Sequence, residues 1–241
     1  MHWNSDLDLN VRGDHVEAQD LAWRSIGACG TWSTRTERVA LAELVIEALT
    51  DPDPLAAWVP RSSVADRPAA QGLSDAAVDA AYRIARSPGT LTKDWYTSII
   101  DRGLTPGAYV ELVTIVVRVA SIQRFGAILG IGLPPLPGAE EGDPTRSEPT
   151  GLGYHHHWVP VVRPEEAGKE LSWLYNGGFA PNVRRALSAV PESYRQINPL
   201  QQAGYLPMNA MMALDWHRPG LDRPQMELVA AKTSQVNECF Y

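Results

Sequence analysis

Two side chains near the end of the chain, Glu227 and Cys239, have the types and the spacing of a redox site. On one straight helix a separation of twelve residues would put them about 18 Å apart along the axis, so they could not meet. We therefore expect a helix from Glu227 to Val236 that ends at Asn237, because asparagine is common at helix ends. Cys239 would then begin the next helix, where exposed amides and the helix dipole lower a thiol pKa and favour a nucleophilic thiolate.

The residues around this pair match a longer motif. From Glu227 to Tyr241 the sequence reads Glu-Leu-Val-Ala-Ala-Lys-Thr-Ser-Gln-Val-Asn-Glu-Cys-Phe-Tyr. It resembles the Glu-x11-Cys-x2-Cys-x3-His motif of the alkylhydroperoxidase D and carboxymuconolactone decarboxylase superfamily. The resemblance implies an all-α fold of the alkylhydroperoxidase-D type, assembly into homo-oligomers, and a glutamate that starts a proton relay through a histidine to two cysteines.

The second cysteine of the motif would be the residue after Tyr241, where the sequence ends. Three continuations are expected as alternatives. The next codon is UGA read as selenocysteine, or the sequence stops at an arbitrary boundary, or the motif is truncated in a degenerate copy. A selenol ionises more readily than a thiol and attacks peroxides faster, so a Cys-x2-selenocysteine pair would suit the chemistry.

The elements that must position these residues are predicted to be helices. The patterns of apolar residues have a period near 3.6 and show no alternation typical of strands. The predicted helices are Thr36–Leu49, Leu73–Arg86 with Ser74 as its cap, Thr92–Arg102, Pro106–Leu129, Pro164–Tyr175, Pro181–Val190, Glu192–Ala203, Pro207–Trp216 and Pro224–Val236. Residues 134–153 are rich in Pro, Gly and acidic residues, which predicts a linker between helical units at 1–133 and 154–241.

The two predicted units resemble each other in sequence. Leu104–Val113 parallels Leu221–Val229, which aligns Glu111 with Glu227 in the shared triplet Glu-Leu-Val. At the position of the thiol the first unit has Gln123. We therefore expect an internal duplication in which only the second unit keeps a thiol, and a structural role for Glu111.

The run His155-His156-His157 is a second candidate for chemistry. On extended backbone alternate side chains share a face, so His155 and His157 can point the same way. A loop or the lining of a pocket is favoured over a metal site, because no further ligand lies nearby in sequence. Cys29, which has no partner at close spacing, is expected to be a small buried residue. No metal and no cofactor are predicted.

Composition restricts the partners and the compartment. A net charge of -7 and a pI near 5.4 argue against nucleic acid, which requires basic surfaces. The longest apolar stretch, Leu112–Ile122, is shorter than a membrane span. The first residues are polar and resemble no signal peptide. Two cysteines 209 residues apart form no disulfide framework, so we expect a cytoplasmic protein.

With the resemblance, these observations predict a thiol-dependent, or selenol-dependent, peroxidase or disulfide oxidoreductase. Its partners would be a small peroxide, a thiol reductant and further copies of the chain. Two alternatives stay open: an acid/base enzyme of the carboxymuconolactone decarboxylase type, and a non-enzymatic oligomeric scaffold. The expected catalytic residues are Cys239 and Glu227, and the expected pocket residues are Glu111, His155, His157 and Tyr241.

Overall fold

The computed structural model describes residues 11–52, 72–138, 142–175 and 180–237. Its helices are α1 (Gly13–Arg24), α2 (Arg35–Thr50), α4 (Asp75–Arg86), α5 (Lys93–Asp101), α6 (Pro106–Leu129), α7 (Asn182–Arg185), α8 (Pro191–Gly204) and α9 (Arg223–Val236). Strands β1 (Leu152–Gly153) and β2 (Val161–Val162) form a small antiparallel sheet. The described chain is therefore mostly α-helical, as predicted.

Several predicted helices begin at the side chains that cap them. The Thr34 hydroxyl oxygen accepts a hydrogen bond from the backbone amide of Glu37, whose carboxylate accepts one from the Thr34 amide, and this capping box starts α2. The side chains of Ser74 and Thr92 cap α4 and α5 by accepting a hydrogen bond from the backbone amides of Ala77 and Trp95. The predicted bounds of α6, Pro106 and Leu129, are both confirmed. Gly130 follows the helix in the left-handed conformation and ends it.

Three predicted helices are wrong over most of their length. The segment 164–175 contains only two 3₁₀ turns, η4 (Pro164–Glu166) and η5 (Ser172–Leu174), separated by Gly168 in the left-handed conformation. The segment 207–216 contains only the turn η6 (Met208–Ala210). In 181–190, α7 is four residues long, and the amides of Leu187, Ser188 and Val190 bond three residues back, as in 3₁₀ turns. Helix α1 was not among the predicted helices.

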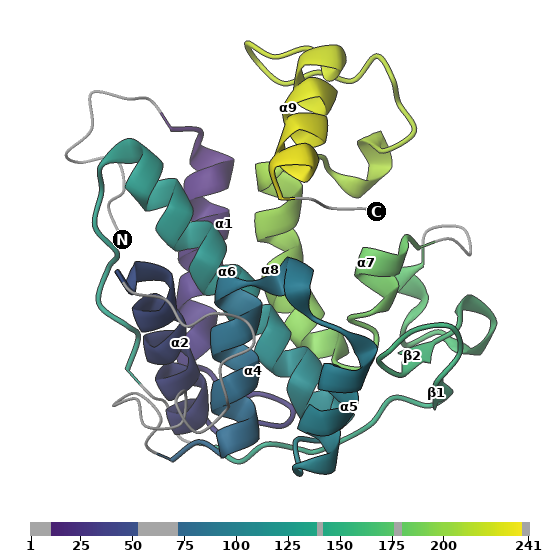
Figure 1. Ribbon diagram of the computed structural model, residues 1–241. Helices are drawn as coiled ribbons and strands as arrows, with labels where there is room; N and C mark the ends of the chain where they lie inside the picture. Colours follow the sequence, from purple (N-terminus) through teal and green to yellow (C-terminus); the bar gives the residue numbers. More distant parts are fainter. Residues whose placement is uncertain (1–10, 53–71, 139–141, 176–179, 238–241) are drawn as a thin grey trace.

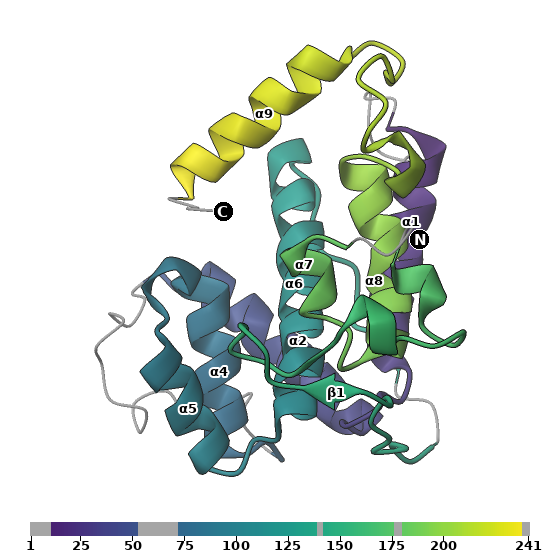
Figure 2. The same ribbon diagram turned by 90° about the vertical axis from the view of Figure 1, so that its right-hand side faces the viewer.

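Helix α6 lies at the centre of the fold (Figures 1 and 2). It packs against α2 and α4 on one side and against α1 and α8 on the other. The core contains Leu112, Ile115 and Ile122 from α6, together with Trp23 from α1 and Ile197 from α8. One hydrophobic cluster thus includes residues from both sides of the segment 134–153. The internal duplication stays a prediction.

Among the described helices, α6 is also long and apolar enough to cross a membrane by length and composition. Its apolar residues are explained by the core, because Leu112, Ile115, Val119 and Ile122 are buried between neighbouring helices. A core helix of this length passes the same test as a membrane span.

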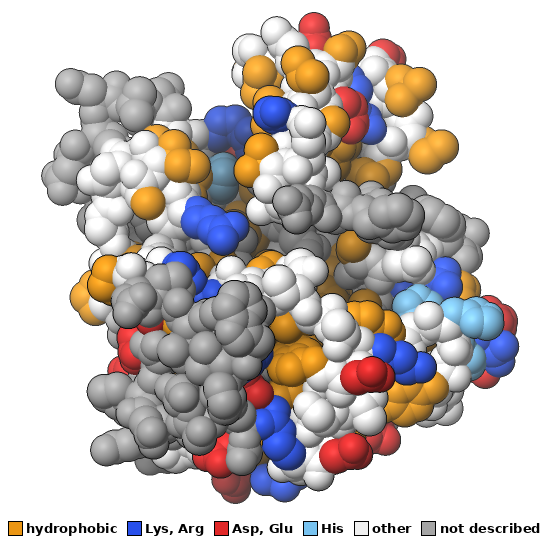
Figure 3. All heavy atoms as spheres, in the orientation of Figure 1, with side chains coloured by type: hydrophobic (Ala, Val, Ile, Leu, Met, Phe, Trp, Pro, Cys, Tyr) orange, Lys and Arg blue, Asp and Glu red, His pale blue; other side chains and the backbone are white. Residues whose placement is uncertain are grey.

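Helix α9 lies across the end of the bundle formed by α6 and α8 (Figures 1 and 2). It buries only Arg223 and Met226. Leu228, Val229 and Val236 are exposed by 71%, 63% and 69%, and Figure 3 shows hydrophobic side chains on this part of the surface. The described contacts therefore leave most of α9 open on the outside.

Candidate functional site

Helix α9 carries Glu227 and has the ends that the sequence predicts. A capping box formed by Asp222 and Gln225 starts the helix. It ends at Val236, where the backbone amide of Asn237 bonds to the carbonyl of Thr233 at 3.1 Å. The predicted end at Asn237 is therefore confirmed. The predicted residues Cys239 and Tyr241 lie outside the described part of the chain.

Glu227 lies at the N-terminal end of α9 and binds two neighbours. Arg223, one helical turn earlier, forms an ion pair with the Glu227 carboxylate. The hydroxyl of Tyr205 donates a hydrogen bond of 2.6 Å to the other carboxylate oxygen. The Tyr205 hydrogen bond, followed by Arg223, holds the pKa of Glu227 below its usual value. Glu227 is therefore ionised at neutral pH.

The pKa of Tyr205 is shifted in the opposite direction, above its usual value. Burial, followed by the hydrogen bond to Glu227, raises the pKa of Tyr205 to about 12. The phenol therefore keeps its proton at neutral pH, and its hydroxyl donates a hydrogen bond to the carboxylate. Such a pair, an ionised carboxylate beside a protonated hydroxyl, has the acid and base forms needed to pass a proton.

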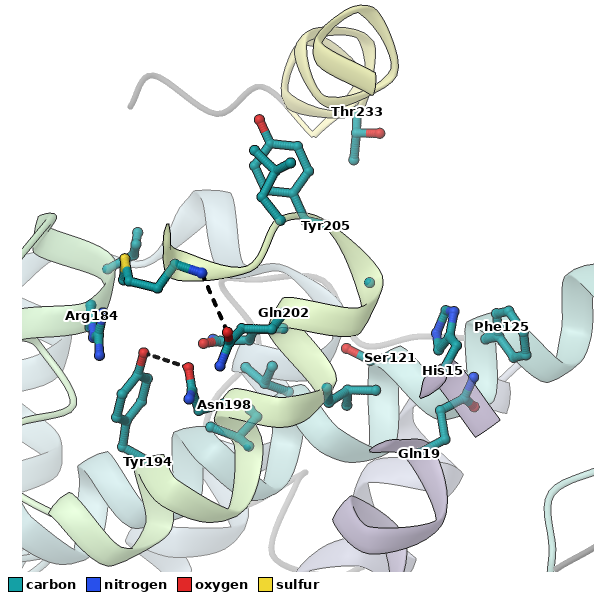
Figure 4. A pocket seen from close by; sticks show the side chains of 18 of the residues that line it. His15, Gln19, Ser121, Phe125, Arg184, Tyr194, Asn198, Gln202, Tyr205 and Thr233 are labelled. Carbon is teal, nitrogen blue, oxygen red and sulfur yellow. Dashed lines mark hydrogen bonds between the residues drawn. The ribbon is translucent and has the colours of Figure 1, made fainter. Parts of the chain in front are cut away.

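Tyr205 connects this pair to the largest of the described cavities, which has a volume of about 730 Å³ (Figure 4). The cavity lies between α1, α6 and α8, with α7 at one end and Thr233 of α9 at the top. Its apolar lining residues include Val117, Ile197, Leu206 and Met208. Volumes of this size and an apolar lining are typical of binding sites for small molecules.

Polar groups occupy two places in this cavity. At one end Tyr194 donates a hydrogen bond of 3.0 Å to Asn198, and the guanidinium of Arg184 lies over the Tyr194 ring at 5.3 Å. At the other end are Gln19 and His15, whose ring lies 4.7 Å from that of Phe125 at a tilt of 39°. Burial, followed by the charge of Arg12, lowers the pKa of His15, which is therefore neutral at pH 7.

Glu111 is in a different environment. Its side chain is fully buried and accepts hydrogen bonds from the backbone amides of Trp32 at 2.9 Å and Ser33 at 3.3 Å. It also pairs with Arg38 at 3.3 Å. A Cβ at Gly30 would lie 1.8 Å from the Glu111 carboxylate, so only glycine allows this approach. These contacts give Glu111 a structural role and not a place in a pocket with Glu227.

The histidines follow β1 in the chain, and β1 lies away from α9 at the other end of the molecule (Figure 2). His155 and His157 line a second cavity of about 330 Å³ together with Tyr96 and Trp158. The ring of His157 contacts the amide oxygen of Asn182 at 3.3 Å. His155 and His157 thus share a cavity, but the structure does not bring them to Glu227.

Two further observations concern metal and thiol chemistry. Within the described ranges, no three or more His, Cys, Asp or Glu side chains are grouped as metal ligands. Cys29 is half-buried rather than buried, and its thiol lies 3.4 Å from the carbonyl oxygen of Gly142.

Comparisons of the chain with known protein families, with curated proteins and with solved structures found no match. Function is therefore inferred from the residues and geometry described above, together with the motif resemblance.

The sequence alone gave no indication of the large cavity or of its polar residues. Gln19, Arg184 and Tyr194 come from three different helices and belong to no motif. The only sequence signal near them is the polar face of the helix predicted at 192–203, which includes Tyr194 and Asn198.

Proposed function

We propose that the protein is a thiol-dependent peroxidase in which Cys239 attacks the peroxide and Glu227 carries protons. The observation that carries the proposal is the pairing of Glu227 with the Tyr205 hydroxyl at the edge of the 730 Å³ cavity. Glu227 lies on a helix that ends at Val236, three residues before Cys239. The motif resemblance supports the same pair of residues.

The proposed reaction has three steps. The Cys239 thiolate attacks one oxygen of the peroxide ROOH, the O–O bond breaks, and the leaving alkoxide takes a proton to become ROH. Cys239 is then a sulfenic acid. A first external thiol condenses with it to a mixed disulfide and releases water, and a second external thiol frees Cys239 and leaves as the external disulfide.

In this reaction Glu227 and Tyr205 would supply and recover the proton of the leaving alkoxide. Glu227 is ionised and Tyr205 is protonated at neutral pH, so the pair begins with one proton to share. The cavity beside Tyr205 is mainly apolar, which favours an organic hydroperoxide over hydrogen peroxide as the substrate.

The test is the reduction of cumene hydroperoxide with dithiothreitol as the reductant. We expect turnover that Cys239→Ser abolishes and that the matched control Cys29→Ser leaves unchanged. Glu227→Gln should lower kcat more than it raises KM, because it removes a proton carrier rather than a contact with substrate. Turnover that survives Cys239→Ser would contradict the proposal.

The acid/base alternative is favoured by one observation, the Glu227–Tyr205 pair itself, which needs no thiol to transfer a proton. Turnover of a γ-carboxylated lactone that withstands alkylation of both cysteines and is lost in Glu227→Gln would favour this alternative. Peroxidase turnover that alkylation abolishes would exclude it as the source of that activity.

A further inference from the structure

We propose that the 730 Å³ cavity binds a small apolar carboxylic acid, whose carboxylate pairs with the guanidinium of Arg184. This site does not depend on the thiol chemistry proposed above, because it is defined by the cavity and its own side chains. Three observations support the proposal: an incompletely paired buried cation, the absence of acidic side chains from the described residues that line the cavity, and an apolar interior of suitable size.

Arg184 is buried, with 6% of its surface exposed, and lines the cavity. One of its terminal nitrogens donates to the carbonyl of Trp173 at 3.0 Å. Its Nε and Nη1 atoms are buried and have no hydrogen-bond partner among the described residues. A buried guanidinium is costly unless it is paired with an anion or fully hydrogen-bonded. An unused N–H group on the planar, charged guanidinium can donate to a carboxylate oxygen.

The Tyr194 ring supports this reading of Arg184. The guanidinium lies over the ring at 5.3 Å, a cation–π contact that helps to fix its orientation. In Figure 4 both side chains lie at the same end of the cavity. The arginine is thus held in position before any ligand arrives, and this lowers the entropic cost of binding.

The residues that line the cavity also favour an anion. The chain carries 28 acidic against 21 basic residues, yet no Asp or Glu is among the described residues that line the cavity. Arg184 and the exposed Arg124 contribute positive charge to its lining. A low-dielectric cavity with charge of only one sign attracts ligands of the opposite sign.

The rest of the cavity suits an apolar body. Val117, Ile197, Leu206 and Met208 provide most of the surface between its two ends. At the end away from Arg184, Gln19 is 1% exposed, and neither polar atom of its side chain has a hydrogen-bond partner. An unpaired buried amide is costly, so a ligand with a polar group at its far end would gain further affinity there.

The experiment measures binding of octanoate and of 1-octanol to the full chain by isothermal titration calorimetry. The two probes share an eight-carbon chain and differ in charge. We expect octanoate to bind at least about tenfold more tightly than octanol, because a charged hydrogen bond contributes more than a neutral one. Equal affinity for the two probes, or no binding of octanoate at millimolar concentration, would overturn the proposal.

Two variants locate the site. Arg184→Gln should weaken octanoate binding about tenfold to a hundredfold and leave octanol unchanged. The matched control Arg185→Gln, next to it in sequence and not among the lining residues, should bind both probes as the native protein does. Octanoate binding that is unchanged in a folded Arg184→Gln variant would refute the role of Arg184.

A third variant keeps the test decisive if Arg184→Gln fails to fold. Ser121 is exposed on α6 and lines the cavity, so Ser121→Trp fills the space without touching Arg184. It should weaken both probes while thermal unfolding stays cooperative. Unchanged binding of both probes would show that the ligand binds elsewhere and would overturn the proposal. Peroxidase activity is not read in any of these experiments, so the two proposals can fail separately.

Discussion

Replacing Glu111 by alanine should be one of the most damaging single changes in this protein. The carboxylate is fully buried and accepts hydrogen bonds from two backbone amides, those of Trp32 and Ser33. It is also paired with the buried Arg38, and a second buried arginine, Arg118, lies close enough for the charge of Arg38 to affect its pKa. Burial, followed by the charge of Arg38, lowers the pKa of Arg118, whereas Glu111 raises it.

The magnitude follows from these contacts. Breaking a buried ion pair by removing one partner costs about 3–5 kcal/mol. Leaving a buried backbone amide unpaired costs about 1–3 kcal/mol. These costs overlap, because one carboxylate serves all three donors, so we expect Glu111→Ala to lower the free energy of unfolding by about 4–6 kcal/mol. Typical domains have only about 5–15 kcal/mol in total.

Urea unfolding followed by circular dichroism measures this change. Glu111→Gln should lose less stability than Glu111→Ala, because an amide oxygen can still accept one of the backbone hydrogen bonds. The matched control is Glu43→Ala on the exposed face of α2, which should change stability by less than about 0.5 kcal/mol. A loss below about 1.5 kcal/mol for Glu111→Ala would refute the reasoning, since even the lower estimate for a broken buried pair exceeds it.

Two further predictions concern Gly30, which lies against the Glu111 carboxylate, and Glu227 on α9. Gly30→Ala should destabilise the fold by about 1–3 kcal/mol, because its Cβ would overlap the Glu111 carboxylate, whereas Gly204→Ala, which faces open space, should not lower the Tm. Glu227 has a lowered pKa, so its stabilising effect is present above the ordinary carboxyl pKa and is lost as the pH falls through the lower folded value. The Tm of Glu227→Gln should therefore fall less than that of the native protein between about pH 6 and pH 3, and equal falls would contradict this prediction.

The parts of the fold that sequence could predict are those with strong local signals. Helix α6 has apolar residues along its length, Pro106 in its first turn and Gly130 in the left-handed conformation at its end, and the prediction for it was confirmed. In α9 the signals were Pro224 in the first turn and Asn237 at the end. Such signals act within one or two turns of helix, and they need no knowledge of tertiary structure.

The segments 164–175 and 207–216 have helix-compatible composition without such support. Gly168 adopts a positive φ, and most of each segment lies in turns that bond three residues back. What holds them is tertiary: the Tyr175 hydroxyl donates to the carbonyl of Val162, and Arg223 donates to the carbonyls of Ala210 and Ala213. Contacts between residues so far apart in sequence have no periodic signature that could have been recognised.

The candidate site also contains some residues that could be predicted from sequence and others that could not. Glu227 was predicted from a motif, but its partner Tyr205 lies 22 residues earlier, at the end of α8. Gln19 and Arg184, which line one cavity, are separated by 165 residues. Their importance depends on burial without hydrogen-bond partners, a property that exists only in the folded chain.

Glu111 and Glu227 show why a shared local sequence does not assign a shared role. Both begin the triplet Glu-Leu-Val on a helix. Glu111 lies on the central helix, where Arg38 and two backbone amides use its oxygens and exclude solvent. Glu227 lies on a helix that is open on its outside, and one of its oxygens accepts from a hydroxyl that can itself exchange a proton. The two carboxylates thus differ in exposure and in the kind of group that hydrogen-bonds to them, although they begin the same triplet. The proton-carrying role that we propose for Glu227 therefore gives no ground for the same role in Glu111.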